Sequence, residues 1–300
     1  IRIFPTKGHP IVYAEWLGAP GAPTVLLYGH YDVQPVDPLN LWTSPPFEAT
    51  IRGDNVYARG TADDKGQVLI HFKSIEAFMK TDGRLPVNIK MIIEGEEEIG
   101  SEHLGPFVKA HKKMLKADLV VISDTSMFAR GVPSLCYGLR GLSYMQIEVS
   151  GPNRDLHSGS FGGSVHNPVQ ALAEIIAKLH DDRGRVTIPG FYDKVRKLTA
   201  KERSSFRKLP WNDRKYAKEL GVGELYGERG YTTLERLWAR PTLECNGIWG
   251  GFTGEGAKTV LPAKAAAKIS MRLVPDQKAA DVARRFERYI KKIAPPTVKV

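Results

Sequence analysis

The sequence Glu94-Gly-Glu-Glu-Glu-Ile-Gly-Ser101 follows directly after the apolar run Val87-Asn-Ile-Lys-Met-Ile-Ile93. The run is typical of a buried strand, so four carboxylates lie within five residues at the carboxyl end of that strand. Carboxylates this close repel one another, and each is costly to remove from water unless a positive charge lies beside it. A solvated surface loop or a bound cation would relieve the repulsion, and this stretch alone leaves both open.

Length and composition describe an ordinary globular protein with two expected domains. The chain has 300 residues, of which 42% are hydrophobic and 25% charged. Cys136 and Cys245 form no metal-binding or redox spacing, which favours a reduced, cytoplasmic setting. No apolar run approaches the ~20 residues of a membrane-spanning helix. The net charge of +10 comes from basic residues scattered over expected helices without a nucleic-acid-reading motif, so we expect neither a nucleic-acid nor a membrane partner.

Two other apolar segments also end in potential metal ligands. The segment 24–28 is expected to form a buried strand that leads into His30 and Asp32. These two side chains would lie on the same side of an extended chain, and a carboxylate beside a histidine commonly orients a metal-binding imidazole. The segment 117–123 is expected to form another buried strand, and it ends at Asp124.

Ligands of open α/β sheets bind beyond the carboxyl ends of the strands. Asp63 lies where a short strand turns into a helix, so the potential ligands at such ends are His30, Asp63, Glu98 and Asp124. Nitrogen and oxygen donors without thiolates indicate a hydrolytic zinc or manganese centre rather than a structural zinc site.

The first part of the chain is therefore expected to form an α/β domain. Helices are predicted at 67–80 and 102–116, and Asp63 and Asp64 lie where the dipole of the first helix favours negative charge. The apolar residues of this first helix are expected to form its buried face: Val68, Leu69, Phe72, Ile75, Ala77, Phe78 and Met79.

Beyond Pro133 the pattern changes to that of a small α+β domain. The expected elements are a strand at 142–150, a helix at 167–179, strands at 242–249 and 264–274, a helix at 276–293 capped by Asp276, and a strand beginning at 297. If the charged, irregular stretch 183–230 is left out, the order is βαββαβ, which is typical of a ferredoxin-like domain.

The motifs of this chain, taken in order, resemble those of the M20 family of metallopeptidases, and within it the dipeptidase branch that includes the carnosine dipeptidases. The matching motifs are Gly29-His-Tyr-Asp-Val-Gln-Pro35, Arg59-Gly-Thr-Ala-Asp-Asp-Lys-Gly66, Glu94-Gly-Glu-Glu-Glu-Ile-Gly-Ser101, Ile122-Ser-Asp124, Tyr137-Gly-Leu-Arg-Gly141, Asp155-Leu-His-Ser-Gly159, Gly254-Glu-Gly-Ala-Lys-Thr-Val260 and Met271-Arg-Leu-Val-Pro275. The resemblance implies a zinc-peptidase-like α/β catalytic domain in residues 1–137. It also implies a ferredoxin-like lid domain in residues 138–300, through which the protein forms a homodimer.

The resemblance further implies two divalent metal ions, with Zn²⁺ expected first and Mn²⁺ or Co²⁺ as alternatives. One ion would be held by His30 and Asp124, and the other by Glu98, with Asp63 bridging the two. Two cations in a shared site would explain how so many carboxylates gather without prohibitive repulsion. In the family the bond between Asp63 and Asp64 is a cis peptide.

The resemblance also assigns catalytic and substrate-binding roles. Asp32 would orient the histidine ligand, and Glu97 would be the general base acting on a water between the two ions. In the lid, His157 and Thr259 would reach the active site of the partner subunit, where the histidine helps to stabilise the oxyanion. Arg272 would hold the terminal carboxylate of a short peptide.

Two further glutamates of the cluster, Glu94 and Glu96, receive no role and are interpreted as supporting or solvent-facing groups. The chain ends at Val300, before the family's last metal-binding histidine and its Gly-rich substrate loop, so we expect an internal part of a longer enzyme. The predicted function is hydrolysis of a dipeptide. The alternatives are a deacylase of the same family that acts on N-acyl amino acids, and a non-catalytic interaction module.

Overall fold

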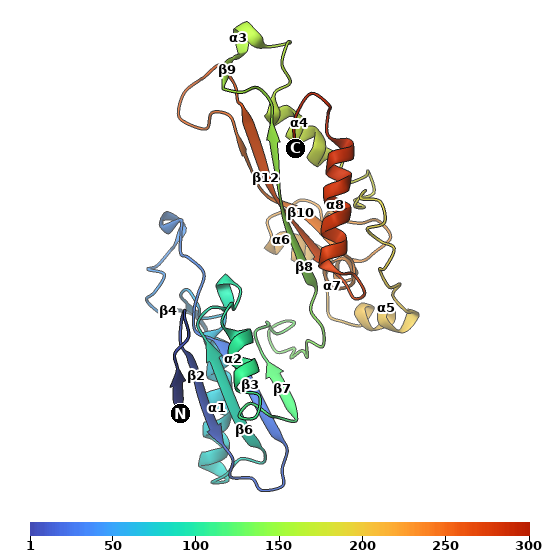
Figure 1. Cartoon of the computed structure of the whole chain (residues 1–300). Helices are drawn as coiled ribbons and strands as arrows, with labels where there is room; N and C mark the ends of the chain where they lie inside the picture. The colour runs from blue at the N-terminus through green and yellow to red at the C-terminus, as the bar shows by residue number, and fades with distance from the viewer. The chain divides into compact units, whose positions relative to one another are not determined.

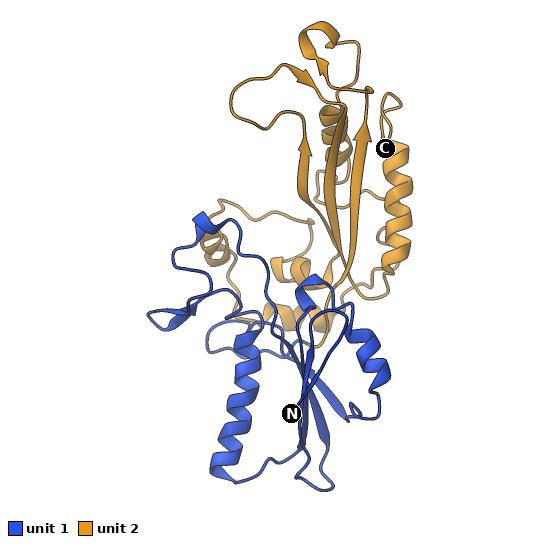
Figure 2. Ribbon diagram, turned by 60° about the vertical axis from the view of Figure 1, so that its left-hand side comes forward, with its two compact units in different colours: residues 1–136 blue, residues 137–300 orange.

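The structure is a computed structural model that describes all residues from 1 to 300. The chain folds as two compact units, residues 1–136 and 137–300, which are coloured separately in Figure 2. None of its helices combines the length and the apolar character needed to cross a lipid bilayer.

Unit 1 is built on a five-stranded sheet with the strand order β1-β2-β6-β3-β7 (Figure 1). The strands are β1 (Arg2–Phe4), β2 (Ile11–Trp16), β3 (Thr24–His30), β6 (Asn88–Glu94) and β7 (Leu119–Ile122). Because β3 runs parallel to both β6 and β7, the carboxyl ends of these three strands lie at one edge of the sheet. The three strands expected from the sequence are confirmed.

The long connection between β3 and the first helix contains a short helix, η1 (Leu39–Leu41), and a hairpin of β4 (Thr50–Arg52) and β5 (Asn55–Tyr57). After β6 the chain forms a 3₁₀ turn, η2 (Glu97–Ile99), and then α2 (Leu104–Ala110). Helix α2 is shorter than expected, because the chain leaves the helix after Ala110 and returns Leu115 to the core. This core joins the sheet to α2 and consists of Ile11, Tyr13, Leu26, Ile92, Phe107 and Leu115.

Helix α1 (Lys65–Thr81) begins close to the predicted position, but the prediction of its buried face is wrong. None of its residues is buried, and Leu69 and Phe72 are 53% and 46% exposed. The helix packs beside β3 so closely that a Cβ on Gly29 would lie 2.4 Å from a methyl of Val68. Outside this contact with β3, its other apolar side chains remain largely exposed.

Unit 2 contains a three-stranded antiparallel sheet of β8 (Gly141–Ser150), β10 (Thr242–Gly250) and β12 (Lys264–Leu273), in the order β10-β12-β8 (Figure 1). The expected last strand is reduced to one bridge, in which Lys299 pairs with Ser150 of β8. With helices α4 (Pro168–Ala177) and α8 (Ala279–Ile293), these strands follow the expected order as βαββα, and the Lys299 bridge stands in the place of the last strand. Apolar residues of the two helices and the sheet form one core, including Ile175, Ile269 and Phe286.

The prediction that Asp276 caps the last helix is wrong. Helix α8 begins three residues later, after Lys278, and has no side-chain cap. Asp276 has a φ of 73° and lies in a turn between β12 and α8. Gln277 closes this turn with two hydrogen bonds to Val274. Its side-chain oxygen accepts from the Val274 N–H, and its backbone N–H donates to the Val274 carbonyl.

The remaining elements of unit 2 are small. Strand β9 (Leu156–His157) pairs with β11 (Val260–Leu261), and α3 (Ser158–Phe161) follows β9 directly. The charged stretch 183–230, in which only short helical pieces are expected, contains α5 (Ala200–Arg207) and α6 (Asp213–Glu219), and α7 (Thr233–Ala239) follows it.

Candidate metal centre

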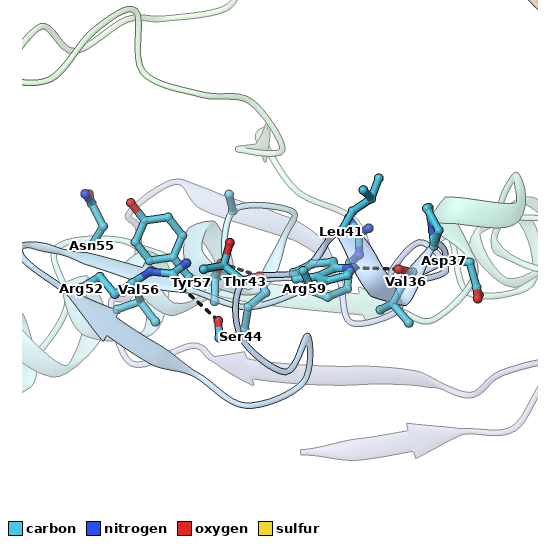
Figure 3. A pocket seen from close by; sticks show the side chains of 15 residues that line it. Val36, Asp37, Leu41, Thr43, Ser44, Arg52, Asn55, Val56, Tyr57 and Arg59 are labelled. Atoms are coloured by element: carbon cyan, nitrogen blue, oxygen red, sulfur yellow. Dashed lines mark hydrogen bonds between the residues drawn. The ribbon is translucent and has the colours of Figure 1, made fainter.

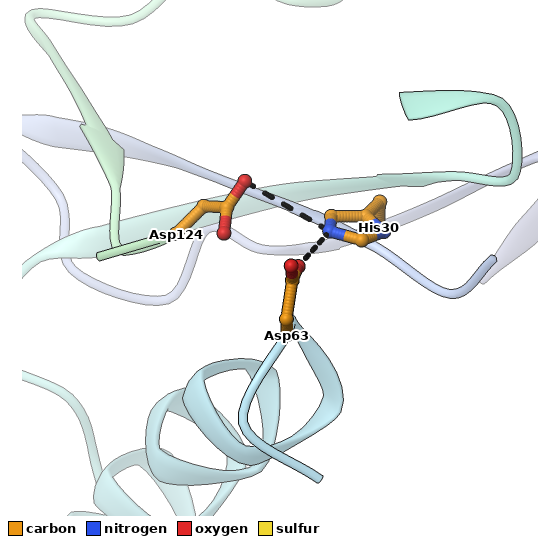
Figure 4. Close-up of side chains that lie close together, drawn as sticks. All are labelled: His30, Asp63 and Asp124. Carbon is orange, nitrogen blue, oxygen red and sulfur yellow. Dashed lines mark hydrogen bonds and ion pairs between the residues drawn. The ribbon is translucent and has the colours of Figure 1, made fainter. Parts of the chain in front are cut away.

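His30 ends β3 and lies at the centre of the candidate site. Its side chain is fully buried, and its Nε2 atom lies 2.9 Å from an oxygen of Asp63 and 3.8 Å from one of Asp124 (Figure 4). On the other side of the ring, Nδ1 lies 3.2 Å from the carboxylate of Asp32. Burial alone would lower the pKa of His30, but the hydrogen bond to Asp63 and the nearby carboxylates outweigh burial and raise this pKa.

His30, Asp63 and Asp124 form a compact set of potential metal ligands, which we call the histidine–aspartate group. One donor atom from each of them lies within 4.8 Å of the other two. The group combines one imidazole nitrogen with two carboxylate oxygens, a donor set that suits zinc or manganese. The side chain of Asp63 is 59% exposed, so the group is open to solvent on that side.

The structure gives Asp32 a role that the sequence did not predict. Besides facing the His30 ring, its carboxylate accepts hydrogen bonds from the backbone N–H groups of Glu97 and Glu98, at 3.3 and 3.0 Å. Asp32 therefore links the histidine of the group to the turn that carries the two glutamates. The acceptor capacity of a carboxylate at a strand end is visible in a sequence, but its backbone donors, 65 and 66 residues away, are not.

Glu97 and Glu98 begin the η2 turn beyond the carboxyl end of β6. Burial raises the pKa of Glu97, and the charges of Asp124, Glu98 and Asp63 add to this increase while that of His30 opposes it. Glu98 does not belong to the histidine–aspartate group. Its carboxylate accepts a 2.6 Å hydrogen bond from the side chain of Gln34, a residue that sequence reasoning did not select.

Asp64 is also part of the site, although the sequence suggested only a position at the start of a helix. It is 1% exposed, and it precedes α1 without forming a side-chain cap. One of its oxygens accepts a hydrogen bond from the His30 N–H, and the other is buried without a partner. Burial raises the pKa of Asp64. The bond between Asp63 and Asp64 is a cis peptide, as the resemblance implied.

A cavity of about 680 Å³ lies in the connection between β3 and α1 (Figure 3). Its wall carries two arginines that stack on aromatic rings: Arg52 lies 3.9 Å from the centre of Tyr57, and Arg59 lies 5.1 Å from that of Trp42. The lining ends at Ala62 and includes no residue of the histidine–aspartate group. The cavity is thus a neighbour of the candidate site along the chain and not the site itself.

In unit 2 the structure brings His157 and Thr259 together. His157 ends β9, and its Nε2 lies 3.0 Å from the hydroxyl of Thr259, which directly precedes β11. Its Nδ1 accepts a hydrogen bond from the N–H of Gly159, so the ring proton lies on Nε2 and is donated to Thr259. Both side chains are exposed.

Arg272 lies near the opposite end of unit 2 from these two residues. It is exposed on β12, opposite Thr242 of β10 and Leu142 of β8. Arg140 lies close enough to Arg272 for their charges to interact, and Nη1 of Arg140 is buried without a hydrogen-bond partner. Burial and the charge of Arg272 both lower the pKa of Arg140. In the sequence, Arg140 is distinguished only as part of the Tyr137-Gly-Leu-Arg-Gly141 motif.

The sequence model of one protein family, described as the peptidase dimerisation domain, matches residues 137–298. Among known proteins, the chain is 39% identical over 287 residues to the Cys-Gly metallodipeptidase dug1 of Schizosaccharomyces pombe. It is 36% identical over 286 residues to the human Beta-Ala-His dipeptidase. These matches cover 95% of this chain in both cases, but only 60% and 56% of the two relatives.

Solved structures give the same relationship. The M20 family metallo-carboxypeptidase Sso-CP2 from Sulfolobus solfataricus superposes with a TM-score of 0.84 at 40% identity, covering 97% of this chain and 66% of that protein. Human carnosine dipeptidase 1 superposes with a TM-score of 0.79 at 36% identity, covering 95% of this chain and 61% of that one. The matched region, the order of its motifs and the two-unit fold lead to one conclusion: the chain belongs to the M20 family of peptidases, whose members bind divalent metal ions.

Proposed function

We propose that this protein is a metal-dependent dipeptidase in which unit 1 is the catalytic metal-binding domain and unit 2 the lid and dimerisation domain. The observation that supports this function best is the histidine–aspartate group, which lies at the carboxyl edge of the sheet beside a half-buried glutamate, Glu97. The names of the three relatives described above, two of them dipeptidases and one a carboxypeptidase, agree in peptide hydrolysis.

The residues of this site fit a divalent ion. We assign His30 and Asp124 to one ion, Glu98 to a second, and Asp63 to both, with zinc as the resident metal. Asp32 faces Nδ1 of His30, so Nε2, which hydrogen-bonds Asp63 in this structure, is the nitrogen that would bind an ion after losing its proton. Bound ions would lower the pKa of water and polarise a peptide carbonyl.

Glu97 is the proposed general base. Its carboxylate accepts a proton from the attacking water and passes it to the amine of the leaving amino acid, so that the peptide C–N bond breaks and a new carboxylate forms. Burial favours this role because it raises the basicity of the carboxylate. The η2 turn fixes Glu97 through the backbone bonds that Asp32 accepts.

The dimensions of unit 2 favour a homodimer in which each active site uses residues from both subunits. Lys264 and Arg272 lie eight residues apart on β12, which corresponds to roughly 26 Å along a strand. Strand β9, which ends in His157, lies beyond the Lys264 end of β12 (Figure 1), and Thr259 lies beside His157. A dipeptide is much shorter than this distance, so one lid cannot offer both Arg272 and His157 to the same substrate. We therefore assign the terminal carboxylate to Arg272 and the oxyanion to His157 of a second copy.

The function is tested with the full-length protein loaded with zinc, manganese or cobalt. We expect hydrolysis of unblocked dipeptides such as Cys-Gly and β-Ala-His, and loss of this activity after chelation. Turnover of N-acyl amino acids without turnover of dipeptides would instead establish the deacylase. Absence of both activities in the metal-loaded protein, together with salt-dependent binding of nucleic acid, would favour the non-catalytic module. We place the protein in the cytoplasm on the cysteine pattern of its sequence alone.

The shared active site is tested by mixing two inactive variants, His157→Ala and Glu97→Gln. A heterodimer would contain one site with both residues intact, so activity should return after subunit exchange. If exchange is demonstrated by mass and no activity returns, His157 acts within its own subunit or not at all.

A further inference from the structure

Two glutamates of the acidic cluster remain without a role in the proposed reaction. Glu94 and Glu96 are 2% and 4% exposed, so neither is a solvent-facing group. Neither belongs to the histidine–aspartate group. Buried carboxylates are rare unless hydrogen bonds or charges compensate them, and both residues have several hydrogen-bond donors. These donors connect the glutamate turn, which we define as residues 94–101, to three separate parts of unit 1.

Glu94 fastens the turn to β3. Its Oε1 atom accepts a 2.6 Å hydrogen bond from the hydroxyl of Tyr28, which lies on the neighbouring strand. The same oxygen accepts a 2.8 Å hydrogen bond from the hydroxyl of Ser101, the last residue of the turn. The Ser101 N–H in turn donates to the Glu96 carbonyl at 2.7 Å. The two ends of the turn are thus tied to each other and to the strand that ends in His30.

Glu96 fastens the turn to the N-terminal segment and to the start of α2. One oxygen accepts the backbone N–H of His9 at 2.9 Å. The other accepts the Nδ1–H of His103 at 2.8 Å and the backbone N–H of that residue at 3.3 Å. Both oxygens of Glu96 therefore accept hydrogen bonds, and both donor residues, His9 and His103, lie outside the glutamate turn.

The packing around both carboxylates leaves little room for another position of the turn. A Cβ on Gly8 would lie 1.6 Å from Oε1 of Glu96, so the N-terminal segment contacts this carboxylate directly. A Cβ on Gly95 would lie 2.3 Å from the ring of Tyr31, so the backbone between the two glutamates lies against that ring. The turn is therefore confined on both sides as well as hydrogen-bonded.

We propose that Glu94 and Glu96 are positioning residues, which hold the glutamate turn so that Glu97 and Glu98 face the histidine–aspartate group before any ion binds. Without such anchors, repulsion from Asp63 and Asp124 would favour a turn that moves the carboxylates of Glu97 and Glu98 away into solvent. The proposal rests on the proposed function, because it assumes that the position of Glu97 matters for turnover.

The anchoring is tested in the metal-free chain by amide hydrogen exchange, which requires neither an ion nor a substrate. Glu96→Gln retains the shape of the side chain but has only one acceptor oxygen, so it must turn an NH₂ group toward one of its N–H donors. We expect the amides of Ile99, Gly100 and Ser101 to exchange about tenfold faster, which corresponds to the loss of about one hydrogen bond. The matched control is Glu102→Gln, an identical change at an exposed neighbour.

Two further variants keep the test independent of how well Glu96→Gln folds. Tyr28→Phe removes one donor of Glu94, and we expect a smaller acceleration at the same amides. Gly8→Ala places a methyl group of the N-terminal segment against the Glu96 carboxylate and leaves the sequence of the turn unchanged. If both act through Glu96, combining Gly8→Ala with Glu96→Gln should accelerate exchange no more than Glu96→Gln alone. Equal exchange in the wild type and in all three single variants would overturn the proposal.

The catalytic consequence is tested on the full-length protein with a dipeptide. We expect Glu96→Gln to lower kcat about 10- to 100-fold with a nearly unchanged KM, because substrate binding does not depend on the turn while the placement of the base does. Faster exchange with an unchanged kcat would overturn the positioning role while leaving the dipeptidase intact. If wild type and Glu102→Gln hydrolyse no dipeptide, the proposed function fails, and the exchange rates still decide whether Glu96 holds the turn.

Discussion

Replacing Asp32 by asparagine should weaken metal binding, although Asp32 itself is not assigned to an ion. One oxygen of Asp32 accepts the His30 Nδ1–H at 3.2 Å and the Glu97 N–H at 3.3 Å, and the other accepts the Glu98 N–H at 3.0 Å. Asparagine offers a single acceptor oxygen. In one orientation of the amide the NH₂ group faces His30 and Glu97, and in the other it faces Glu98. At least one hydrogen bond is therefore lost in either case.

The expected magnitude follows from the charge of the acceptor. A hydrogen bond to an ionised group contributes about 1.5–3 kcal/mol, and each 1.4 kcal/mol corresponds to about a factor of ten in affinity. Part of this free energy should be recovered by small movements of the turn. We therefore expect Asp32→Asn to weaken zinc or cobalt binding about 10- to 100-fold, which is the range found for residues that orient metal ligands.

The measurement is a competition titration of the metal-free protein against a chelator, with cobalt absorption as a second readout. Asp118→Asn is the control, because the Asp118 carboxylate also accepts a backbone N–H, that of Thr24, but at the opposite end of β3. The control should bind metal like the wild type. If Asp32→Asn folds normally and its affinity stays within about threefold of the wild type, the role assigned to Asp32 is refuted.

Three further outcomes are expected. Glu97→Gln in the full-length protein should abolish dipeptide turnover while metal content stays unchanged, because only the proton acceptor is lost. Arg240→Ala should destabilise unit 2 by about 1.5–3 kcal/mol in urea unfolding, because the 6% exposed Arg240 forms two hydrogen bonds to the buried Glu228, which would keep only its 3.2 Å hydrogen bond from Arg185. The hydrogen bonds from Arg203 hold the pKa of Glu235 below its ordinary 4.5, so this pair's contribution to stability should be present above that pH and be lost as pH falls further. Glu235→Gln should remove this part of the pH dependence.

Each of these outcomes has a control and a contradicting result. Residual turnover of more than a few per cent in Glu97→Gln would mean that another group is the base. Arg229→Ala removes an exposed arginine from the same segment and should leave the urea midpoint nearly unchanged, so equal destabilisation by both changes would contradict the buried-pair explanation. Glu224→Gln is exposed and should retain the acid dependence of the wild type.

Local patterns in the sequence predicted the strands well, because a strand's apolar run and its turn residues are adjacent in the chain. Helix α1 shows where such reasoning fails. Its apolar residues predicted a buried face, but periodicity records only which side of a helix is apolar and not which other element covers it. The helix packs chiefly against β3, and residues such as Phe72 remain exposed. The prediction that Asp276 caps the last helix failed for a different reason, since Gln277 supplies the local hydrogen bonds that fix the turn.

The acidic cluster shows the same limit at the candidate site. In the sequence the four glutamates differ only in position, and the family resemblance gave roles to two of them. In the structure, strand β6 ends at Glu94, and the η2 turn begins at Glu97. Glu94 and Glu96 lie two residues apart and are both directed toward donors supplied by Tyr28, His9 and His103.

Glu97 and Glu98 come after the change from strand to turn, so their backbone N–H groups, not their carboxylates, are the partners of Asp32. The division of roles therefore depends on where the strand stops and on donors that lie up to 87 residues away along the chain. A sequence motif specifies the carboxylates that can bind a cation. The buried hydrogen bonds of their two neighbours determine whether those carboxylates are held where a cation can use them.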